Sequence, residues 1–263
     1  MSTRTALVTG ASTGIGYALC ELLAADGCDL LMIARNADRL NHAAARLRGA
    51  HDAQVTTYAM DLSAPRAAAD LHGRILADGH AVDVLVNNAG FGAYGSFHEA
   101  DEQRHVEMLQ LNVVTLTHLT RLFMPDMLAR GRGRVMNVAS TAAFQAGPLM
   151  SAYFASKAYV LSFSGGIAHE ARGTGVTVTC LCPGPTASGF QSRGNIAQAT
   201  IMQGKLLDAA TVARVGYRAM NRGRALVVVG RMNAFLAFLP RLTPRWFATA
   251  VVAHLQRPGR EHP

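Results

Sequence analysis

Short apolar runs alternate along the chain with longer segments in which apolar residues recur at helical spacing. Seven such runs lie near residues 4–9, 28–34, 54–60, 82–87, 133–139, 175–182 and 225–229. Their lengths are typical of strands that are buried on both faces of a sheet. The segments between them are long enough for helices. This alternation predicts an α/β fold with one doubly wound, Rossmann-type parallel sheet of about seven strands and helices on both faces.

No stretch rich in proline, glycine and serine divides the chain, and 263 residues are enough to bury a substantial core. We therefore predict one domain over residues 1–263, with a core over 1–230 and a C-terminal helical extension over 231–263. The longest candidate apolar run, Ala234 to Leu239, stops at Pro240, well short of the ~20 residues that span a bilayer. A cytoplasmic protein is expected.

The positive charge of the chain is concentrated near its end. Residues 205–263 hold 10 Lys and Arg against 2 Asp and Glu, whereas residues 1–204 hold 15 of each. Apolar and aromatic residues alternate there with Arg231, Arg241, Arg245 and Arg257. This pattern fits an interfacial helix on anionic lipid, a cover for a subunit core or a partner, or an attractor for a phosphate-bearing substrate such as an acyl-CoA. It contains no nucleic-acid recognition motif, so nucleic-acid binding is not expected.

Cysteine and histidine do not occur at metal-ligand spacing. The four cysteines are irregularly placed, with Cys180 and Cys182 inside one strand-like run, and the ten histidines contain no H-x-x-x-H pair. A disulfide framework or a tetrahedral metal site would need a regular set of such ligands. We therefore expect four buried thiols and no metal.

A glycine-rich turn follows the first predicted strand. Residues 9–16 read T-G-A-S-T-G-I-G, and a helical pattern begins at Ile15. We expect Gly10 to form the turn, while Gly14 and Gly16 allow the backbone to approach a ligand closely. Because a helix N-terminus presents unpaired N–H groups to phosphate, this combination of strand, turn and helix predicts a dinucleotide site.

Tyr153 and Lys157 form a Y-x-x-x-K pair, with Ser140 thirteen residues before the tyrosine. A separation of four places both side chains on one face of a helix. A free tyrosine titrates near ~10, but a neighbouring ammonium and a positively charged cofactor ring both favour the phenolate. We expect Tyr153 to exchange a proton near physiological pH as a general acid or base.

These motifs occur in the order found in the short-chain dehydrogenase/reductase family, which the chain resembles from about Arg4 to Gly230. The matching pieces are T-G-A-S-T-G-I-G at 9–16, Asp61-Leu62, Asn87-Asn88-Ala89-Gly90, Asn112, Ser140, Tyr153, Lys157 and Pro183-Gly184-Pro185-Thr186. The resemblance implies an NAD(P)-dependent oxidoreductase, with Asn112, Ser140, Tyr153 and Lys157 as its catalytic residues.

The end of the second strand indicates which dinucleotide binds. A fold that prefers NAD usually carries a carboxylate there for the ribose 2′-hydroxyl, whereas this chain reads Ala34-Arg35-Asn36, followed by Arg39. An arginine can hold a 2′-phosphate bidentately, and the resemblance gives the A-R pair the same meaning. We therefore predict NADP(H) in preference to NAD(H). The alternative is that Arg35 and Arg39 are solvated residues at the start of a helix.

The resemblance also implies the remaining contacts of the cofactor. Asp61 would contact the adenine through its side chain, with Leu62 beside it and Asn88 supporting the ribose, and residues 183–186 would contact the nicotinamide end. The predicted cofactor site consists of Gly10, Ser12, Thr13, Gly14, Ile15, Gly16, Arg35, Arg39, Asp61, Leu62, Asn88, Ala89, Gly90, Tyr153, Lys157, Pro183, Gly184 and Thr186.

The expected reaction is hydride transfer between C4 of the nicotinamide and a carbonyl carbon, with Tyr153 exchanging a proton with the oxygen. Ser140 would hydrogen-bond the same oxygen. Lys157 would lower the pKa of the tyrosine and anchor the nicotinamide ribose, and Asn112 would hold a water of the proton relay.

The segment 187–205 lies where such folds place a mobile lid, and it mixes small polar residues with Phe190, Ile196, Ile201 and Met202. It suggests an apolar carbonyl or alcohol substrate, for which Phe144, Met150 and residues 91–94 are candidate walls. A 3-oxoacyl thioester is the alternative substrate, although the stretch after Gly90 lacks the I-x-x-D of fatty-acid-synthesis reductases.

Two function classes remain open. One is the oxidoreductase, and the other is a dinucleotide-binding sensor or scaffold module without turnover. A sensor has no need of a proton donor, so the intact set of Asn112, Ser140, Tyr153 and Lys157 favours the enzyme. The resemblance further suggests a homodimer or homotetramer built through helices near 101–128 and 151–172.

Overall fold

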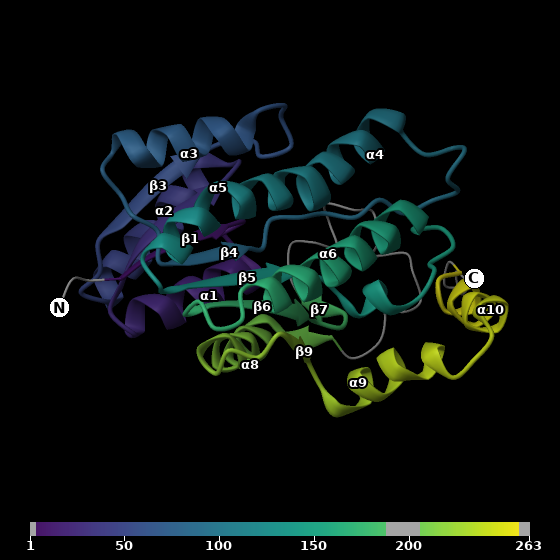
Figure 1. Ribbon diagram of the computed structural model, residues 1–263. Coiled ribbons are helices and arrows are strands. Elements are labelled where there is room, and N and C mark those ends of the chain that lie inside the picture. The colour runs from purple at the N-terminus through teal and green to yellow at the C-terminus, as the bar shows by residue number, and fades with distance from the viewer. Residues whose placement is uncertain (1–3, 188–205, 258–263) are drawn as a thin grey trace.

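A computed structural model describes residues 4–187 and 206–257 of the chain. One parallel sheet of seven strands runs through the molecule in the order β3-β2-β1-β4-β5-β6-β9, with helices packed on both faces (Figure 1). The predicted doubly wound fold is confirmed. The strands are β1 (Arg4–Thr9), β2 (Cys28–Ala34), β3 (Val55–Ala59), β4 (Val84–Asn87), β5 (Gly133–Val138), β6 (Val176–Cys182) and β9 (Leu226–Val228).

Helices connect the strands and cover the sheet. Their bounds are α1 (Gly14–Ala25), α2 (Ala37–Ala50), α3 (Ala67–Ala77), α4 (Glu102–Leu109), α5 (Leu116–Ala129), α6 (Ser151–Glu170), α8 (Ala209–Asn221), α9 (Arg231–Phe238) and α10 (Arg245–Leu255).

The core has two halves because successive side chains of a strand point to opposite faces of the sheet. Ala6 and Val8 of β1 pack toward α1, α2 and α8, whereas Leu7 between them packs toward α3 and α5. All three are fully buried. The continuous apolar runs of the sequence therefore belong to strands covered on both faces.

The direction of strand order reverses between β1 and β4. From β1 the sheet extends through β2 to β3 on one side, and through β4, β5, β6 and β9 on the other. In open parallel sheets, ligands bind beyond the carboxyl ends of the strands at such a reversal. The glycine-rich turn after β1 and the Asn88-Ala89-Gly90 turn after β4 lie at this point.

The long helix expected at 101–128 is interrupted. Between α4 and α5 the backbone forms a π-helical turn over Gln110–Thr115, which contains the buried Asn112. Turns of this kind inside helices are frequent at functional sites. The apolar pattern could not indicate it, because a single widened turn hardly alters helical spacing. Two short strands, β7 (Thr186–Ala187) and β8 (Leu207–Asp208), were also not predicted, since two residues make no pattern.

The chain after β9 forms α9, a 3₁₀ turn over Leu239–Arg241 and α10. These elements extend from the end of the molecule beside α6, coloured yellow in Figure 1. Val252 on the inner side of α10 packs with Met150 and Phe154, and the Tyr94 hydroxyl donates a hydrogen bond of 2.6 Å to the carbonyl oxygen of Gln256. These contacts attach α10 and Gln256 to the rest of the protein. Within the described residues, no helix is both long and apolar enough to cross a membrane.

Candidate active site

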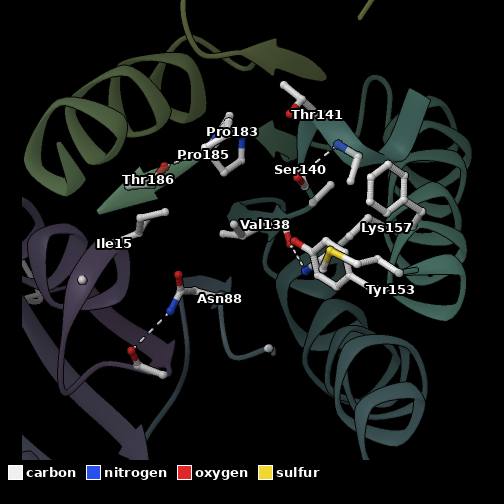
Figure 2. A pocket seen from close by; sticks show the side chains of 18 of the residues that line it. Ile15, Asn88, Val138, Ser140, Thr141, Tyr153, Lys157, Pro183, Pro185 and Thr186 are labelled. Carbon is white, nitrogen blue, oxygen red and sulfur yellow. Dashed lines mark hydrogen bonds between the residues drawn. The ribbon is translucent and has the colours of Figure 1, made fainter. Parts of the chain in front are cut away.

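A cavity opens at the carboxyl ends of β1, β4, β5 and β6 (Figure 2). It brings together residues from most of the predicted motifs. Its lining consists of Gly10, Thr13, Gly14, Ile15, Asn88, Ala89, Gly90, Val138, Ala139, Ser140, Thr141, Ala142, Gln145, Met150, Tyr153, Phe154, Lys157, Pro183, Gly184, Pro185, Thr186 and Gln256.

The glycine-rich turn forms one wall of the cavity. Gly10 has φ of +67° and Gly14 has φ of +59°, a region that side chains with a Cβ rarely adopt. Gly16 leaves no room for a Cβ either, since that atom would meet the carbonyl oxygen of Gly10. Thr13 provides no side-chain cap to α1 within the described part of the chain. The first N–H groups of α1 therefore lie at this wall without a side-chain cap, and such groups can bind a phosphate.

Asn88 joins this turn to β4. Its side-chain amide donates to the carbonyl oxygens of Thr9 at 2.8 Å and Gly10 at 3.3 Å. In return, the Thr9 hydroxyl accepts hydrogen bonds from the backbone N–H groups of Asn88 and Ala89. The two turns at the reversal of the sheet are thus fixed to each other, and Asn88 also lines the cavity.

Ser140, Tyr153 and Lys157 meet on the opposite wall (Figure 2). Ser140 follows β5 and its Oγ accepts a hydrogen bond from the N–H of Ala142 at 3.1 Å. Tyr153 and Lys157 lie one turn apart on α6, and the Lys157 Nζ is 5.8 Å from the centroid of the tyrosine ring. This Nζ donates to the carbonyl oxygen of Val138 at 3.0 Å. The predicted trio is therefore assembled in one place.

Burial controls the titration of this pair. It raises the pKa of Tyr153 to about 12, and a hydrogen bond with Ser140 only partly opposes it. It lowers the pKa of Lys157 to about 8, because the ammonium loses its water. The sequence predicted a phenolate-favouring shift for Tyr153. In the protein without cofactor the shift has the opposite sign, since the desolvation of the phenol exceeds the effect of the Ser140 hydrogen bond.

Asn112 lies behind these residues rather than in the cavity wall. It is 1% exposed, and its amide group exchanges hydrogen bonds with the backbone of Phe91 while also donating to Ser156 Oγ at 3.1 Å. A Cβ at Gly90 would lie 2.8 Å from Asn112 Oδ1 and 3.5 Å from Lys157 Nζ. Asn112 therefore stands close to the lysine, separated from it by a residue that must be small.

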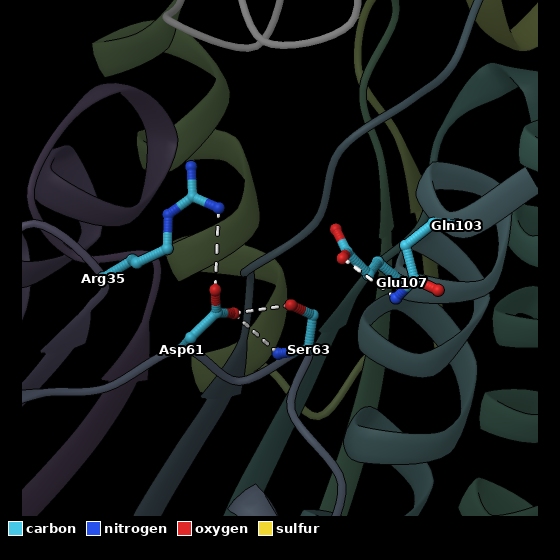
Figure 3. A network of polar contacts seen from close by, with 5 residues as sticks. All are labelled: Arg35, Asp61, Ser63, Gln103 and Glu107. Atoms are coloured by element: carbon cyan, nitrogen blue, oxygen red, sulfur yellow. Dashed lines mark hydrogen bonds and ion pairs between the residues drawn. The ribbon is translucent and has the colours of Figure 1, made fainter. Parts of the chain in front are cut away.

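The predicted cofactor contacts at the far end of the site lie outside the cavity. Arg35 projects from the end of β2 and forms an ion pair of 3.6 Å with Asp61 (Figure 3). Asp61 also accepts hydrogen bonds from the N–H and hydroxyl of Ser63, and the pKa of its carboxyl is lowered, with burial opposing the hydrogen bonds to Ser63. The Arg35 side chain is 71% exposed. It is thus free to turn toward a ligand at the edge of the sheet.

The remaining predicted residues divide between a neighbouring hollow and the core. Ser12 and Arg39 line a second depression together with Tyr17, His42 and Arg46. Leu62 is buried in the core and does not reach the cavity. Among the candidate substrate walls, Met150 lines the cavity, whereas Phe144 packs against a different cluster. Most of the expected lid, residues 188–205, lies outside the described residues.

Sequence reasoning missed Gln145 and Gln256 in the lining. Gln256 lies more than a hundred residues after Tyr153, in a basic and aromatic segment that offered several interpretations. Only the packing of α10 against Met150 and Phe154 could reveal it. Neither glutamine belongs to a motif that the spacing of the chain would single out.

The described part of the chain contains neither a disulfide bond nor a group of residues that could bind a metal ion. All four cysteines are free and buried, as expected. No group of three or more His, Cys, Asp or Glu among the described residues could hold a metal ion. The geometry of the cavity fits a dinucleotide, with a turn for phosphate at one end and a tyrosine, serine and lysine at the other.

Comparison with known proteins gives this geometry a family context. Residues 4–198 match the sequence profile of the family described as short chain dehydrogenase. A short chain dehydrogenase from Pseudocercospora fijiensis is 34% identical over 187 residues, which are 70% of this chain and 60% of that protein.

Two solved structures extend the likeness to nearly the whole chain. A short-chain dehydrogenase from Sphingobium yanoikuyae in complex with NADPH is 28% identical, with a TM-score of 0.81 over 91% of this chain and 93% of that one. A short chain dehydrogenase/reductase from Burkholderia phymatum in complex with NAD is 25% identical, with the same TM-score of 0.81 over 100% of this chain and 98% of that one. NADPH and NAD are therefore each bound in a structure that resembles that of this chain.

Proposed function

The chain belongs to the short-chain dehydrogenase/reductase family, and on that premise we propose that it is an NADP(H)-dependent reductase of apolar carbonyl compounds. Membership makes it an NAD(P)-dependent oxidoreductase. The observation that carries the finer proposal is one cavity that holds the glycine-rich turn together with Ser140, Tyr153 and Lys157.

The side chains of this cavity have separate tasks. The bound cofactor supplies the hydride. Tyr153 gives a proton to the carbonyl oxygen, and Ser140 donates a hydrogen bond to the same oxygen. Because the pKa of Tyr153 is raised to about 12 by burial, the phenol carries its proton at neutral pH. It is therefore ready to act as the acid in carbonyl reduction.

Lys157 and Asn112 assist Tyr153, the proton donor, by positioning the cofactor and a water. Lys157, buried and close to Gly90, binds the ribose hydroxyls of the nicotinamide half. Asn112 holds the water that returns a proton to Tyr153. Its fixed amide, bonded to Phe91 and Ser156, supports this positioning role.

Arg35 decides between the two dinucleotides. Arg35 and Asn36, rather than a carboxylate, directly follow β2, where a ribose 2′-hydroxyl would need an acceptor, and the Arg35 guanidinium is exposed. A 2′-phosphate can replace the Asp61 carboxylate as its partner. Asp61 then remains free for the adenine.

The substrate end of the cavity is apolar. Val138, Ala142, Met150 and Phe154 line it near Tyr153, and such a surface favours a hydrophobic ketone, aldehyde or secondary alcohol. A 3-oxoacyl thioester remains the second substrate class. It is therefore tested alongside the apolar ketones and aldehydes.

We further propose a homo-oligomeric, single-domain protein in the cytoplasm. The helices α4, α5 and α6 carry exposed Val106, Leu109, Leu128 and Tyr159, which supports a homodimer or homotetramer built through them. We place all 263 residues in one domain, with residues 231–263 as an extension of the core. The four free thiols fit a reducing compartment such as the cytoplasm.

The extension also presents a surface suited to anionic lipid. Its described part holds Arg231, Arg241, Arg245 and Arg257 but no acidic residue, beside exposed apolar side chains. A second copy of the same surface would bring like charges together, whereas anionic headgroups would neutralise them. The exposed apolar residues of this surface are Met232, Phe235, Leu236, Phe238, Leu242, Trp246, Phe247, Val251 and Leu255.

The proposal is tested by dissociation constants for NADPH and NADH, followed by oxidation of each cofactor with apolar ketones, aldehydes and 3-oxoacyl thioesters. We expect tight NADPH binding with turnover. Arg35→Ala should weaken NADPH binding about tenfold or more, the loss expected for one charged hydrogen bond, and leave NADH binding unchanged. Arg74→Ala, an exposed arginine on α3, is the control. Binding without turnover would support a sensor, and an NADH preference would refute the role of Arg35.

A further inference from the structure

Gln256 is a buried polar residue in the wall of the active-site cavity. It directly follows α10 as its C-cap, is 1% exposed and lines the cavity beside residues of α6. Its side-chain oxygen Oε1 is buried and accepts no hydrogen bond within the described part of the chain. A buried oxygen left without a donor costs about 1–3 kcal/mol, so a ligand that supplies a donor to it gains binding energy.

The position of Gln256 is fixed from two sides. Tyr94 holds its backbone through the hydrogen bond of 2.6 Å to the carbonyl oxygen. One turn earlier, Val252 packs with Met150 and Phe154. The side chain is therefore anchored at the substrate end of the cavity. The glycine-rich turn, which suits phosphate, forms the other end.

We propose that Gln256 Oε1 forms a recognition subsite that accepts a hydrogen bond from a hydroxyl group of the substrate. This group is separate from the carbonyl that is reduced. The inference rests on the proposed function and deepens it. The substrate class becomes an apolar ketone or aldehyde that carries a second, neutral hydrogen-bond donor away from its carbonyl.

The charges around the cavity favour a neutral donor over an ammonium. None of the described residues that line the cavity is aspartate or glutamate, while Lys157 lies among them. A cationic substrate would leave water without a counter-charge and close to the lysine, which is costly. A hydroxyl carries no such cost, and the apolar side chains of Met150 and Phe154 accommodate its hydrocarbon frame.

Matched pairs of ketones test the subsite. Two frames of different length are used, 4-hydroxyacetophenone and 6-acetyl-2-naphthol, each beside its methyl ether, which has similar shape but no donor. Calorimetric dissociation constants are measured on the enzyme saturated with NADP⁺, where no ketone can be reduced, and kcat/KM is measured with NADPH. For at least one frame, we expect the hydroxyl compound to have a dissociation constant about tenfold or more below that of its ether, and a kcat/KM about tenfold or more above it.

Variants assign the preference to one oxygen. Gln256→Met keeps the length of the side chain without the acceptor and should reduce the ratio to about one, whereas Gln256→Glu keeps an acceptor and should retain it. Gln145→Met, at another glutamine of the same cavity, should leave the ratio within about twofold. Unchanged NADPH affinity and a melting temperature no lower than that of the wild type show that each variant is folded.

The outcomes separate the subsite from the reductase itself. Equal binding of hydroxyl compound and ether in both frames, tighter binding of the ethers, or a preference that survives Gln256→Met would overturn the subsite. If no ketone is reduced with NADPH, the proposed reductase function fails, yet the binding ratio on the NADP⁺ complex still decides for or against Gln256.

Discussion

Burial gives Tyr153 and Lys157 their chemistry. Both side chains are withdrawn from water in α6, so the phenol holds its proton more strongly and the ammonium less strongly than in solution. The Y-x-x-x-K spacing was sufficient to predict that the two lie on one face of a helix. It could not predict the sign of the tyrosine shift, because desolvation depends on residues from distant strands. For the same reason, Gln256 could not be found from the sequence.

The titration of Lys157 predicts how stability depends on pH. Burial lowers its pKa to about 8 in the folded protein, from an ordinary value of 10.5. Between these values the unfolded chain binds the proton and the folded protein does not, so this group makes stability rise with pH. The free energy of unfolding of wild type, minus that of Lys157→Met, should increase by roughly 1–2 kcal/mol between pH 7.5 and 9.5.

Urea unfolding of the cofactor-free protein at several pH values measures this difference. Tyr153 does not interfere, since its pKa is raised to about 12 and its contribution changes only above about pH 10. A difference that stays constant or falls over this range would show that the ammonium keeps its proton in the folded protein.

The elements of the fold follow the apolar pattern closely. All seven strands of the sheet form where continuous apolar runs occur, because parallel strands covered on both faces need them. The glycine-rich turn also lies where strand and helix patterns meet. Elements that have no periodic pattern of apolar residues could not be predicted. The π-helical turn at Gln110–Thr115 contains Asn112, whose side chain is hydrogen-bonded to Phe91 and Ser156. No local pattern indicates such long-range contacts.

Alanine substitutions at two helical glycines test whether the glycine-rich turn approaches the cofactor closely. Gly16→Ala would place a Cβ against Gly10 and the Asn88 side chain. It should weaken NADPH binding at least tenfold, because the turn must shift. A Cβ at Gly73, an exposed position of α3, would meet no described atom within 4 Å. Gly73→Ala should leave NADPH binding unchanged and raise stability by about 0.5–1 kcal/mol.

Fluorescence titration with NADPH and thermal unfolding of both variants measure these effects. Equal NADPH affinity of the Gly16→Ala protein and wild type would mean that the turn does not approach the cofactor as closely as proposed.

At the scale of the whole molecule, the C-terminal extension joins the active site to the surface. Val252 of α10 packs with Met150 and Phe154 at the cavity, whereas Trp246 and Val251 of the same helix are exposed. The sequence indicated the basic and aromatic character of this segment and left its partner open. The structure shows that these apolar side chains are exposed, which favours an external partner over a place in the core.

Vesicles of defined composition test whether this partner is anionic lipid. The protein should bind phosphatidylglycerol-containing vesicles at low salt but not pure phosphatidylcholine, with a blue shift of Trp246, the single tryptophan of the chain. Arg241→Glu with Arg245→Glu should weaken binding at least tenfold, at about 1 kcal/mol for each basic residue.

The matched control reverses two exposed arginines elsewhere, Arg74→Glu with Arg222→Glu. Equal binding of both double variants would indicate attraction by net charge alone. Failure to bind vesicles, together with dimers that Leu242→Arg dissociates in sedimentation experiments, would assign the surface to a second copy of the chain.

The central claim is that Tyr153 supplies the proton for carbonyl reduction, and Tyr153→Phe tests it most directly. The control is Tyr159→Phe on the same helix, whose hydroxyl contacts Thr117 at 2.9 Å on the surface. With a ketone that the wild type reduces, kcat of Tyr153→Phe should fall about 100-fold or more, while its NADPH affinity stays within about twofold and Tyr159→Phe keeps wild-type activity. Ketone reduction by Tyr153→Phe at the wild-type rate would contradict the mechanism.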